Sequence, residues 1–113
     1  MNLKEINISV EVHCLRPDWA ISHHNPKYNI VRYRLYVEED LITERNWSWD
    51  NNIFLNENIW IATNKDTNTV IIEPVLYRPE QACFTLKNLQ ITNYPFKIDN
   101  NQDTSIQFTT INT

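Results

Sequence analysis

The residue types of a hydrolytic triad occur close together near the N-terminus, as Asp18, Ser22 and His24. A serine nucleophile needs a histidine base and an orienting carboxylate, but nothing in the spacing of these three residues favours that arrangement. The chain contains no Gly. A nucleophile elbow, a phosphate-binding loop and a dinucleotide-binding turn all require Gly where the backbone bends tightly or touches a ligand. The sequence therefore predicts no catalytic residues and a protein that is not an enzyme.

Four potential metal ligands occur in the same part of the chain, at His13, Cys14, His23 and His24. Structural zinc sites use short, fixed spacings of Cys and His that this stretch does not contain. We therefore expect no metal and no other cofactor, and we interpret the adjacent histidines as a polar surface element. The second cysteine is Cys83. Each thiol is expected to be free and buried, with a single disulfide as the alternative, because both cysteines lie in predicted strands.

Aromatic residues provide the clearest signal for binding. Trp47 and Trp49 are two positions apart, so a strand would project both rings to one face. An exposed pair of indoles can stack on a sugar ring or anchor a protein interface, whereas a buried pair would fill the core, and the sequence leaves both alternatives open. Interface energy concentrates in Trp, Tyr and Arg, and all three types occur on the predicted hairpin Leu35–Trp49. The candidate interface residues are Tyr36, Arg45, Trp47 and Trp49.

We expect this hairpin, with its turn at Glu39-Asp40, to contribute to the principal contact surface, because an edge strand also offers unpaired backbone groups to a partner. The alternative is that two loops make the contact, Leu15–Asn29 and Arg78–Gln81, since loops often carry function. Trp60 and Tyr77 are further candidates for exposed rings.

Strands must position these residues, because apolar and polar residues alternate with period two through most of the chain. The 113 residues match the size of one domain, residues 1–113. We predict an all-β fold, a single antiparallel β-sandwich or jelly roll of about eight strands, with one short helical turn beginning near residue 17. The predicted strands cover residues 6–14, 31–37, 41–49, 53–63, 69–76, 82–91, 96–98 and 105–111. The predicted core includes Ile8, Val10, Val12, Val31, Tyr33, Leu35, Ile59, Ile61, Ile71, Phe84 and Leu86.

The absence of Gly also constrains the turns. A residue with positive φ must then be Asn or Asp, the next most tolerant types. Such residues occur where turns are predicted, at Asp40, Asp50–Asn52, Asn64–Asn68 and Asp99–Asn101. Pro74 predicts that the end of its strand lies at a sheet edge, because Pro cannot donate to the ladder.

The charge of the chain is acidic, with 14 Asp and Glu against 10 Lys and Arg. A phosphate backbone binds to a cationic surface, so no nucleic-acid partner is expected, and Arg32 and Arg34 are interpreted as part of a solvated sheet face. No apolar run approaches the roughly 18 residues of a membrane-spanning helix, so no membrane partner is expected. Met1–Ser9 lacks both an apolar run and a cleavage site, and we expect no signal peptide.

Four segments between Asn29 and Val75 resemble a known family: Tyr33–Val37, Leu41–Trp47, Glu57–Ile61 and Ile72–Val75. Together they resemble the pattern of small β-sandwich proteins of tailed phages that infect marine bacteria, which are virion-associated proteins. More distantly, the pattern is similar to jelly-roll carbohydrate-binding modules.

The phage resemblance implies a structural protein of the virion, either a capsid decoration protein or a tail accessory protein. It would be made in the host cytoplasm, and its partners would be other virion proteins and copies of itself in a symmetric assembly. The second resemblance implies the alternative function, recognition of a glycan through exposed Trp residues. Neither resemblance implies a catalytic residue.

Overall fold

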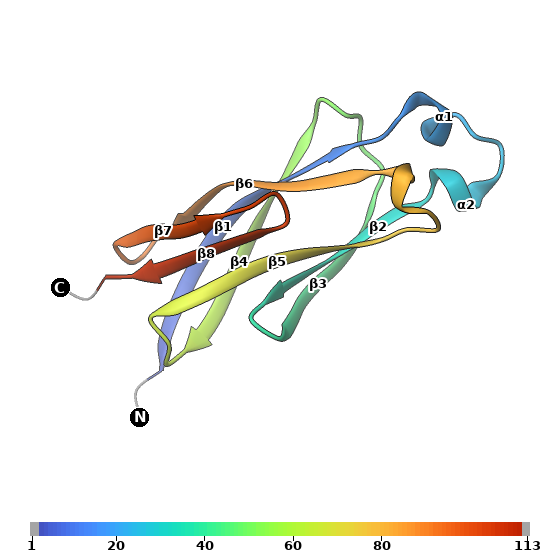
Figure 1. Ribbon diagram of the computed structural model, residues 1–113. Coiled ribbons are helices and arrows are strands. Elements are labelled where there is room, and N and C mark those ends of the chain that lie inside the picture. Colours follow the sequence, from blue (N-terminus) through green and yellow to red (C-terminus); the bar gives the residue numbers. More distant parts are fainter. Residues whose placement is uncertain (1–2, 112–113) are drawn as a thin grey trace.

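The computed structural model describes residues 3–111. Within this range the chain forms eight β-strands, all paired antiparallel, in two sheets with the orders β4-β1-β6 and β3-β2-β5-β8-β7. The two sheets face each other across one core (Figure 1). The predicted all-β sandwich is therefore confirmed.

The elements follow one another along the chain in this order: β1 (Lys4–Leu15), α1 (Asp18–Ile21), α2 (Pro26–Asn29), β2 (Val31–Val37), β3 (Asp40–Trp47), β4 (Phe54–Thr63), β5 (Thr67–Val75), the 3-10 turn η1 (Pro79–Gln81), β6 (Cys83–Ile91), β7 (Phe96–Asn101) and β8 (Ser105–Thr110).

The core forms where the alternating strands turn their apolar faces inward. β1 lies in the middle of the smaller sheet and contributes Ile6, Ile8, Val10 and Val12, all fully buried. β2 lies opposite in the larger sheet and contributes Tyr33, among others. The buried residues that pack together in this core are Ile6, Ile8, Val10, Val12, Cys14, Val31, Tyr33, Leu35, Val37, Trp47, Ile59, Val70, Ile72, Ala82, Phe84, Leu86, Leu89, Ile91, Ile106 and Phe108.

Two residues of the predicted core differ from expectation. Ile61 is only half-buried against the core, and the prediction that Ile71 faces inward is wrong, because its side chain is 36% exposed. Three apolar residues stand in a row at this point, so alternation alone could not fix the phase of the strand. Pairing with β2 fixes it, since Ile72 lies opposite the buried Leu35 and Ile71 lies opposite the outward-facing Tyr36.

One turn places a positive φ at a residue type that the sequence did not lead us to expect. At the β2–β3 turn the residue with positive φ is Glu38, with φ 56°, and not Asn or Asp. Asn88 also has a positive φ, of 54°, but it lies at a bulge within β6 and not in a turn. Glu38 is held in its turn by β5, because its backbone N–H donates to the Thr69 carbonyl at 2.8 Å and its Oε1 accepts from the Thr69 N–H at 2.9 Å. The predicted turn at Asp99–Asn101 is also wrong, since these residues belong to β7 and the chain turns at residues 102–104.

Pro74 lies where its strand has an open side. β8 pairs with β5 only from Thr67 to Ile71, so the last residues of β5 have β2 alone as a neighbour. The missing N–H of Pro74 therefore costs no hydrogen bond to a second strand, and the predicted edge position is confirmed.

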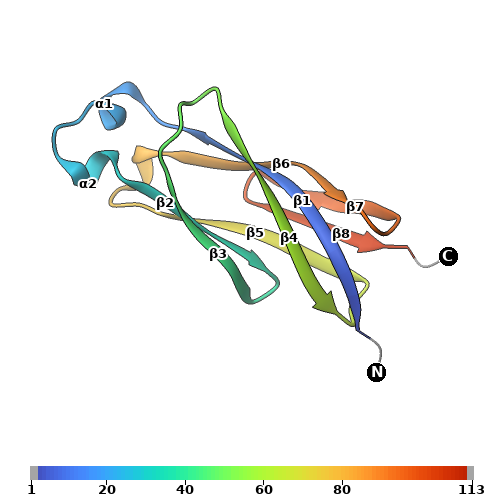
Figure 2. The same cartoon turned by 180° about the vertical axis from the view of Figure 1, so that it is seen from behind.

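The molecule is elongated, with extents of 54 × 23 × 19 Å. Both helices, η1 and the β3–β4 connection lie at one end, while β1 begins and β8 ends toward the other (Figures 1 and 2). α1 confirms the predicted helical turn after Pro17. We did not predict α2, although Asn25-Pro26 is a start signal: the Asn25 side chain accepts from the Lys27 N–H, and Pro26 occupies the first turn. No helix within residues 3–111 is long and apolar enough to cross a membrane.

The two cysteines are free and occupy different environments. Cys14 is buried, as predicted, and burial raises the pKa of its thiol to about 12. Cys83 is exposed, which corrects the expectation of a second buried thiol. It lies opposite Leu15 while Cys14 lies opposite Phe84, so the two thiols point to opposite faces of the smaller sheet.

Candidate functional site

The two Trp residues of the proposed interface belong to the interior. Trp47 is 2% exposed and packs against Tyr33 and Phe84 in the core. Trp49 is half-buried and meets Trp47 edge to face, with 5.1 Å between ring centroids. The Trp47 indole N–H donates to the carbonyl of Trp49 at 2.9 Å. Of the two alternatives left open by the sequence, the core alternative is the one that the structure supports for this pair.

Arg45 lies between the two sheets at their open side. Its Nε donates to Oε2 of Glu57 at 2.7 Å, and the hydroxyl of Tyr33 donates to the same oxygen at 2.8 Å. Glu57 is a β4 residue whose side chain is only 4% exposed. Burial, followed by the hydrogen bond to this carboxylate, raises the pKa of Tyr33. The cluster joins the two sheets through a buried carboxylate, which our interpretation of the sequence missed. The available signal was an acidic residue at an inward position of an alternating strand.

Tyr36 points away from Arg45, onto the outer face of the larger sheet. Its hydroxyl lies 3.5 Å from Glu73, and Arg34 bridges Glu73 and Glu44 at 3.4 and 3.3 Å. These exposed pairs, with Arg32 beside them, form the solvated sheet face that the sequence predicts. The prediction that Tyr36, Arg45, Trp47 and Trp49 form one patch is therefore wrong, because the four side chains lie on two faces and in the core.

The alternative contact surface is formed by two loops, residues 15–29 and 78–81. Unlike the four residues of the hairpin, these loops meet at one end of the sandwich. Gln81 is fully buried between them. Its Nε2 donates to the Lys27 carbonyl at 2.7 Å, and its Oε1 accepts from the Arg78 N–H at 2.6 Å. This amide fixes the loop 15–29 against the loop 78–81.

A cluster of rings joins the same two loops. Tyr28 is at its centre, with ring centroids of His23, Tyr77 and Trp19 at 4.4, 5.3 and 5.9 Å. His24 stacks on His23 at 4.9 Å. The histidines thus stack on each other and against Tyr28, while Tyr28 meets Trp19 and Tyr77 edge to face. Such ring contacts stabilise loops that have little core of their own.

Cations cover these rings. The Lys27 ammonium lies 5.4 Å from the ring centroid of Tyr77, and the Arg78 guanidinium lies 5.7 Å from the same centroid and 6.0 Å from that of Tyr28. The distances are those of cation–π contacts. The loop end of this acidic chain is therefore rich in both aromatic and cationic groups.

Two hollows of about 440 and 340 Å³ lie on this end of the molecule and share Ile30 and Arg32. We call them together the Ile30 groove. Ile30 and Ile21 are exposed in it, and no Asp or Glu occurs among the described residues that line it. Its lining residues are Arg16, Ile21, Lys27, Asn29, Ile30, Val31, Arg32, Asn46, Trp47, Ser48, Val75, Leu76 and Tyr77.

Arg16 ties the groove to the β3–β4 connection. Its guanidinium donates to the carbonyls of Asn29 and Trp49 at 3.4 and 3.0 Å, whereas its buried Nε has no hydrogen-bond partner within residues 3–111. Arg32 remains partly solvated, with Nε donating to Asn46 at 3.0 Å. The groove thus presents three cations beside branched apolar side chains. This chemistry suits an acidic ligand that also carries an apolar group.

Comparison of the chain with protein-family models, with curated proteins and with solved structures found no match. Function must therefore be inferred from the geometry of the chain's own residues.

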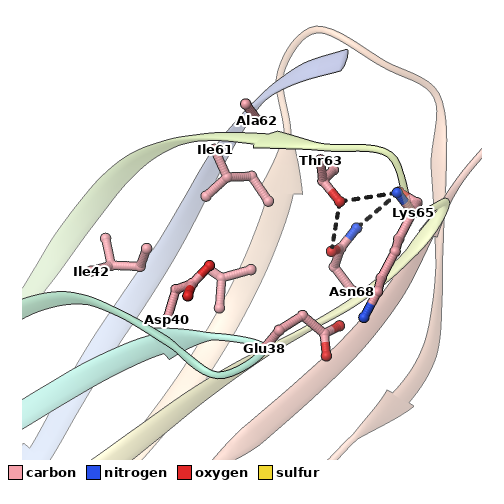
Figure 3. Close-up of a pocket in the computed structure, with 9 residues that line it drawn as sticks. Glu38, Asp40, Ile42, Ile61, Ala62, Thr63, Lys65 and Asn68 are labelled. Atoms are coloured by element: carbon pink, nitrogen blue, oxygen red, sulfur yellow. Dashed lines mark hydrogen bonds between the residues drawn. The ribbon is translucent and has the colours of Figure 1, made fainter. Parts of the chain in front are cut away.

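A smaller cavity, of about 150 Å³, lies between the sheets beside the β2–β3 turn (Figure 3). The Thr63 hydroxyl donates to Asn68 Oδ1 at 3.4 Å, and both side chains also bond the Lys65 backbone. The Lys65 N–H donates to the Thr63 hydroxyl at 3.0 Å, and the Asn68 amide donates to the Lys65 carbonyl at 3.2 Å. Ile42 and Ile61 form its apolar wall. The arrangement supports the turn and the β4–β5 loop. Its lining residues are Val37, Glu38, Asp40, Ile42, Ile61, Ala62, Thr63, Lys65 and Asn68.

The four potential metal ligands of the sequence do not come together. His13 lies on the outer face of the smaller sheet, where it stacks on Phe54 at 5.0 Å and hydrogen-bonds Glu11 at 2.9 Å. Cys14 points into the core, and the His23-His24 pair is part of the ring cluster at the loop end. Within residues 3–111 no group of three or more His, Cys, Asp or Glu is placed to hold a metal ion. The hydrogen bond from His13 lowers the pKa of Glu11.

Proposed function

We propose that this chain is a non-enzymatic structural subunit of a tailed-phage virion, either a capsid decoration protein or a tail accessory protein, that docks through its loop end. The observation that carries the proposal is that exposed apolar side chains gather at the loop end. At the loop end they accompany the cations of the Ile30 groove and the ring cluster. The exposed large apolar residues there are Leu15, Trp19, Ile21, Ile30, Ile53, Phe54 and Tyr77.

Exposed apolar side chains scattered singly over a surface need no explanation, but a group of them rimmed by charge is typical of an interaction site. Each apolar group that a partner covers contributes roughly 25 cal/mol per Å² removed from water. The cations add selectivity for an acidic partner rather than much affinity. A rigid sandwich with a docking end suits a subunit held in many copies on a symmetric surface.

The test is the protein composition of particles purified by density gradient and measured by quantitative mass spectrometry. We expect the chain to be present at a fixed ratio to a major structural protein and to stay with particles after a high-salt wash and a second gradient. Absence from purified particles, or loss in proportion to soluble host proteins, would refute the proposal.

A second candidate function, glycan binding, has one observation in its favour. Trp60 is 64% exposed on the outer face of the smaller sheet. It lies across the strand pair from Asn7, whose amide donates to Asn58 at 2.6 Å. Further along the same face, the Ser9 hydroxyl donates to Asn56 at 3.0 Å. An exposed indole beside amides can stack on a sugar and bond its hydroxyls.

The glycan alternative is tested by a glycan array with the unchanged chain and with Trp60→Ala. Binding abolished by Trp60→Ala, and retained by the control Phe54→Ala on the same face, would favour the glycan function. Absence of binding to any glycan would leave the virion proposal as the better account.

A further inference from the structure

The chain carries, away from the Ile30 groove, a group of acidic and apolar side chains that is complementary to the groove. The β2–β3 turn and the start of β3 present Glu39, Asp40 and Leu41, and all three residues are exposed, Leu41 by 52%. No hydrogen bond or ion pair within residues 3–111 engages the carboxylates of Glu39 and Asp40. Two free carboxylates followed by an exposed Leu match a groove that offers Lys27 and the partly solvated Arg32 beside exposed isoleucines.

We propose that the Ile30 groove of one copy receives the β2–β3 turn of a second copy, so that the chains associate head to tail. This inference rests on the proposed docking role of the loop end and names its occupant. The carboxylates of Glu39 and Asp40 would face Lys27 and Arg32, while Leu41 would cover Ile30.

A copy cannot fill its own groove. Arg32 begins β2 at the groove and Glu39 follows its far end, so the strand itself separates the two by about 20 Å at roughly 3.3 Å per residue. Both backbone and side chain of Glu38 bond Thr69, which fixes the turn against β5. The contact must therefore form between molecules, and the turn is already ordered for it, which lowers the entropic cost of binding.

The geometry favours side-chain docking over extension of the sheet. β3 is an edge strand, but it carries Glu44 and Arg45 and shows a register shift against β2 between Leu35 and Tyr36. Charges and bulges on an edge strand discourage pairing with another chain. The turn, in contrast, forms the tip of the hairpin at the edge of the larger sheet, where the side chains of Glu39 and Asp40 are exposed (Figures 1 and 2).

A contact between two different surfaces of the same chain is heterologous, and it closes into a ring or continues as a filament. Because solvated charges contribute much of it, the contact is individually weak and falls with ionic strength, where the screening length drops from about 30 Å at 0.01 M to about 10 Å at 0.1 M. Many such contacts on a particle act together through their high local concentration.

The experiment uses charge reversal on each surface and then mixes the variants. The groove variant is Lys27→Glu with Arg32→Glu, and the turn variant is Glu39→Lys with Asp40→Lys. Lys97→Glu on β7 and Asp103→Lys in the β7–β8 turn are the matched controls, because both residues are exposed and lie outside the groove and the β2–β3 turn. Circular dichroism confirms that each variant keeps its strands.

Sedimentation velocity over a concentration series at low salt should show self-association of the unchanged chain and of both controls. Each reversed variant alone should associate at least tenfold more weakly. An equimolar mixture of the groove and turn variants should associate again, because each reversed surface then meets its opposite charge. Strict monomers for the unchanged chain, equal association of the variants, or no recovery on mixing would each overturn the inference.

A second measurement keeps the test independent of how the variants fold. A carbodiimide joins a lysine amine to a carboxylate only where the two are in contact. With a mixture of ¹⁴N- and ¹⁵N-labelled unchanged chains, we expect Lys27 linked to Glu39 or Asp40 in peptides that carry both labels. Links only within one label would overturn the second-copy assignment, as would groove binding of an acidic peptide by a chain that stays monomeric.

Discussion

Replacement of Arg45 by Met tests the buried carboxylate that joins the two sheets. Glu57 is 4% exposed, and its Oε2 accepts hydrogen bonds from Arg45 and Tyr33. Met keeps most of the length of the Arg stem, so little packing is lost and the change acts mainly on the charge. The carboxylate then retains one neutral donor, the hydroxyl of Tyr33.

The expected cost lies between two limits. Removing one partner of a fully buried ion pair costs about 3–5 kcal/mol, whereas an exposed pair is worth about 0.2–1 kcal/mol. Arg45 is 47% exposed, so water already screens its side of the pair. We therefore expect a loss of about 2 kcal/mol, which corresponds to a fall in Tm of about 10 °C for a domain of this size.

The assay is urea unfolding followed by Trp fluorescence, in which the midpoint should fall without a change in slope. Arg34→Met is the matched control, because it removes only exposed ion pairs, those with Glu44 and Glu73, and should cost less than about 1 kcal/mol. In the Glu57→Gln background, Arg45→Met should lower the free energy of unfolding by only about 0.5 kcal/mol, since no buried charge is then left without a partner. An equal cost for Arg45→Met and Arg34→Met, or an equal cost in both backgrounds, would refute the reasoning.

Three further predictions follow from burial and charge. Leu35→Ala should lower the free energy of unfolding by about 2–5 kcal/mol, and Ile71→Ala by less than about 1 kcal/mol. Similar losses for the two variants would contradict the assignment of Leu35 to the core and Ile71 to the surface. In native protein at pH 8 a thiol reagent should modify Cys83 and spare Cys14, whose pKa is raised to about 12, and fast labelling of both would contradict the burial of Cys14. The lowered pKa of Glu11 means that its small contribution to stability is present at neutral pH and is lost as pH falls through that pKa. In an NMR titration the midpoint of the Glu11 carboxyl should lie below that of an unperturbed Glu, and it should rise when the histidine two residues on is replaced by Ala.

The sequence predicts the strands of this fold well because period-two alternation depends only on which face is buried. It predicts Tyr33 and Leu35 inward and Tyr36 outward, and the structure agrees. The same rule cannot resolve a continuous apolar run, so the phase of Ile71 was wrong. Pairing with β2, which lies far away in sequence, is what decides it.

The candidate interface failed for a related reason. Alternation places Trp47 on one face of its strand, but it does not say whether that face meets the core or solvent. β3 is an edge strand, and its register against β2 puts Trp47 opposite the buried Val31. The sequence predicted the Ile30 groove only as two separate loops. Its assembly depends on the buried Gln81 and on rings that lie far apart in the chain, such as Tyr28 and Tyr77 at 5.3 Å.

We propose that the chain is a virion subunit held in place through its loop end, and the number of copies per particle tests this directly. Particles from a host that supplies the unchanged chain, the Lys97→Glu control or the Lys27→Glu, Arg32→Glu variant are purified in parallel. Copies per particle are then counted by mass spectrometry with isotope-labelled standards. We expect equal, high occupancy for the unchanged chain and the control, and loss of most copies for the groove variant. Full occupancy by the groove variant, or absence of every form from the particles, would contradict the account.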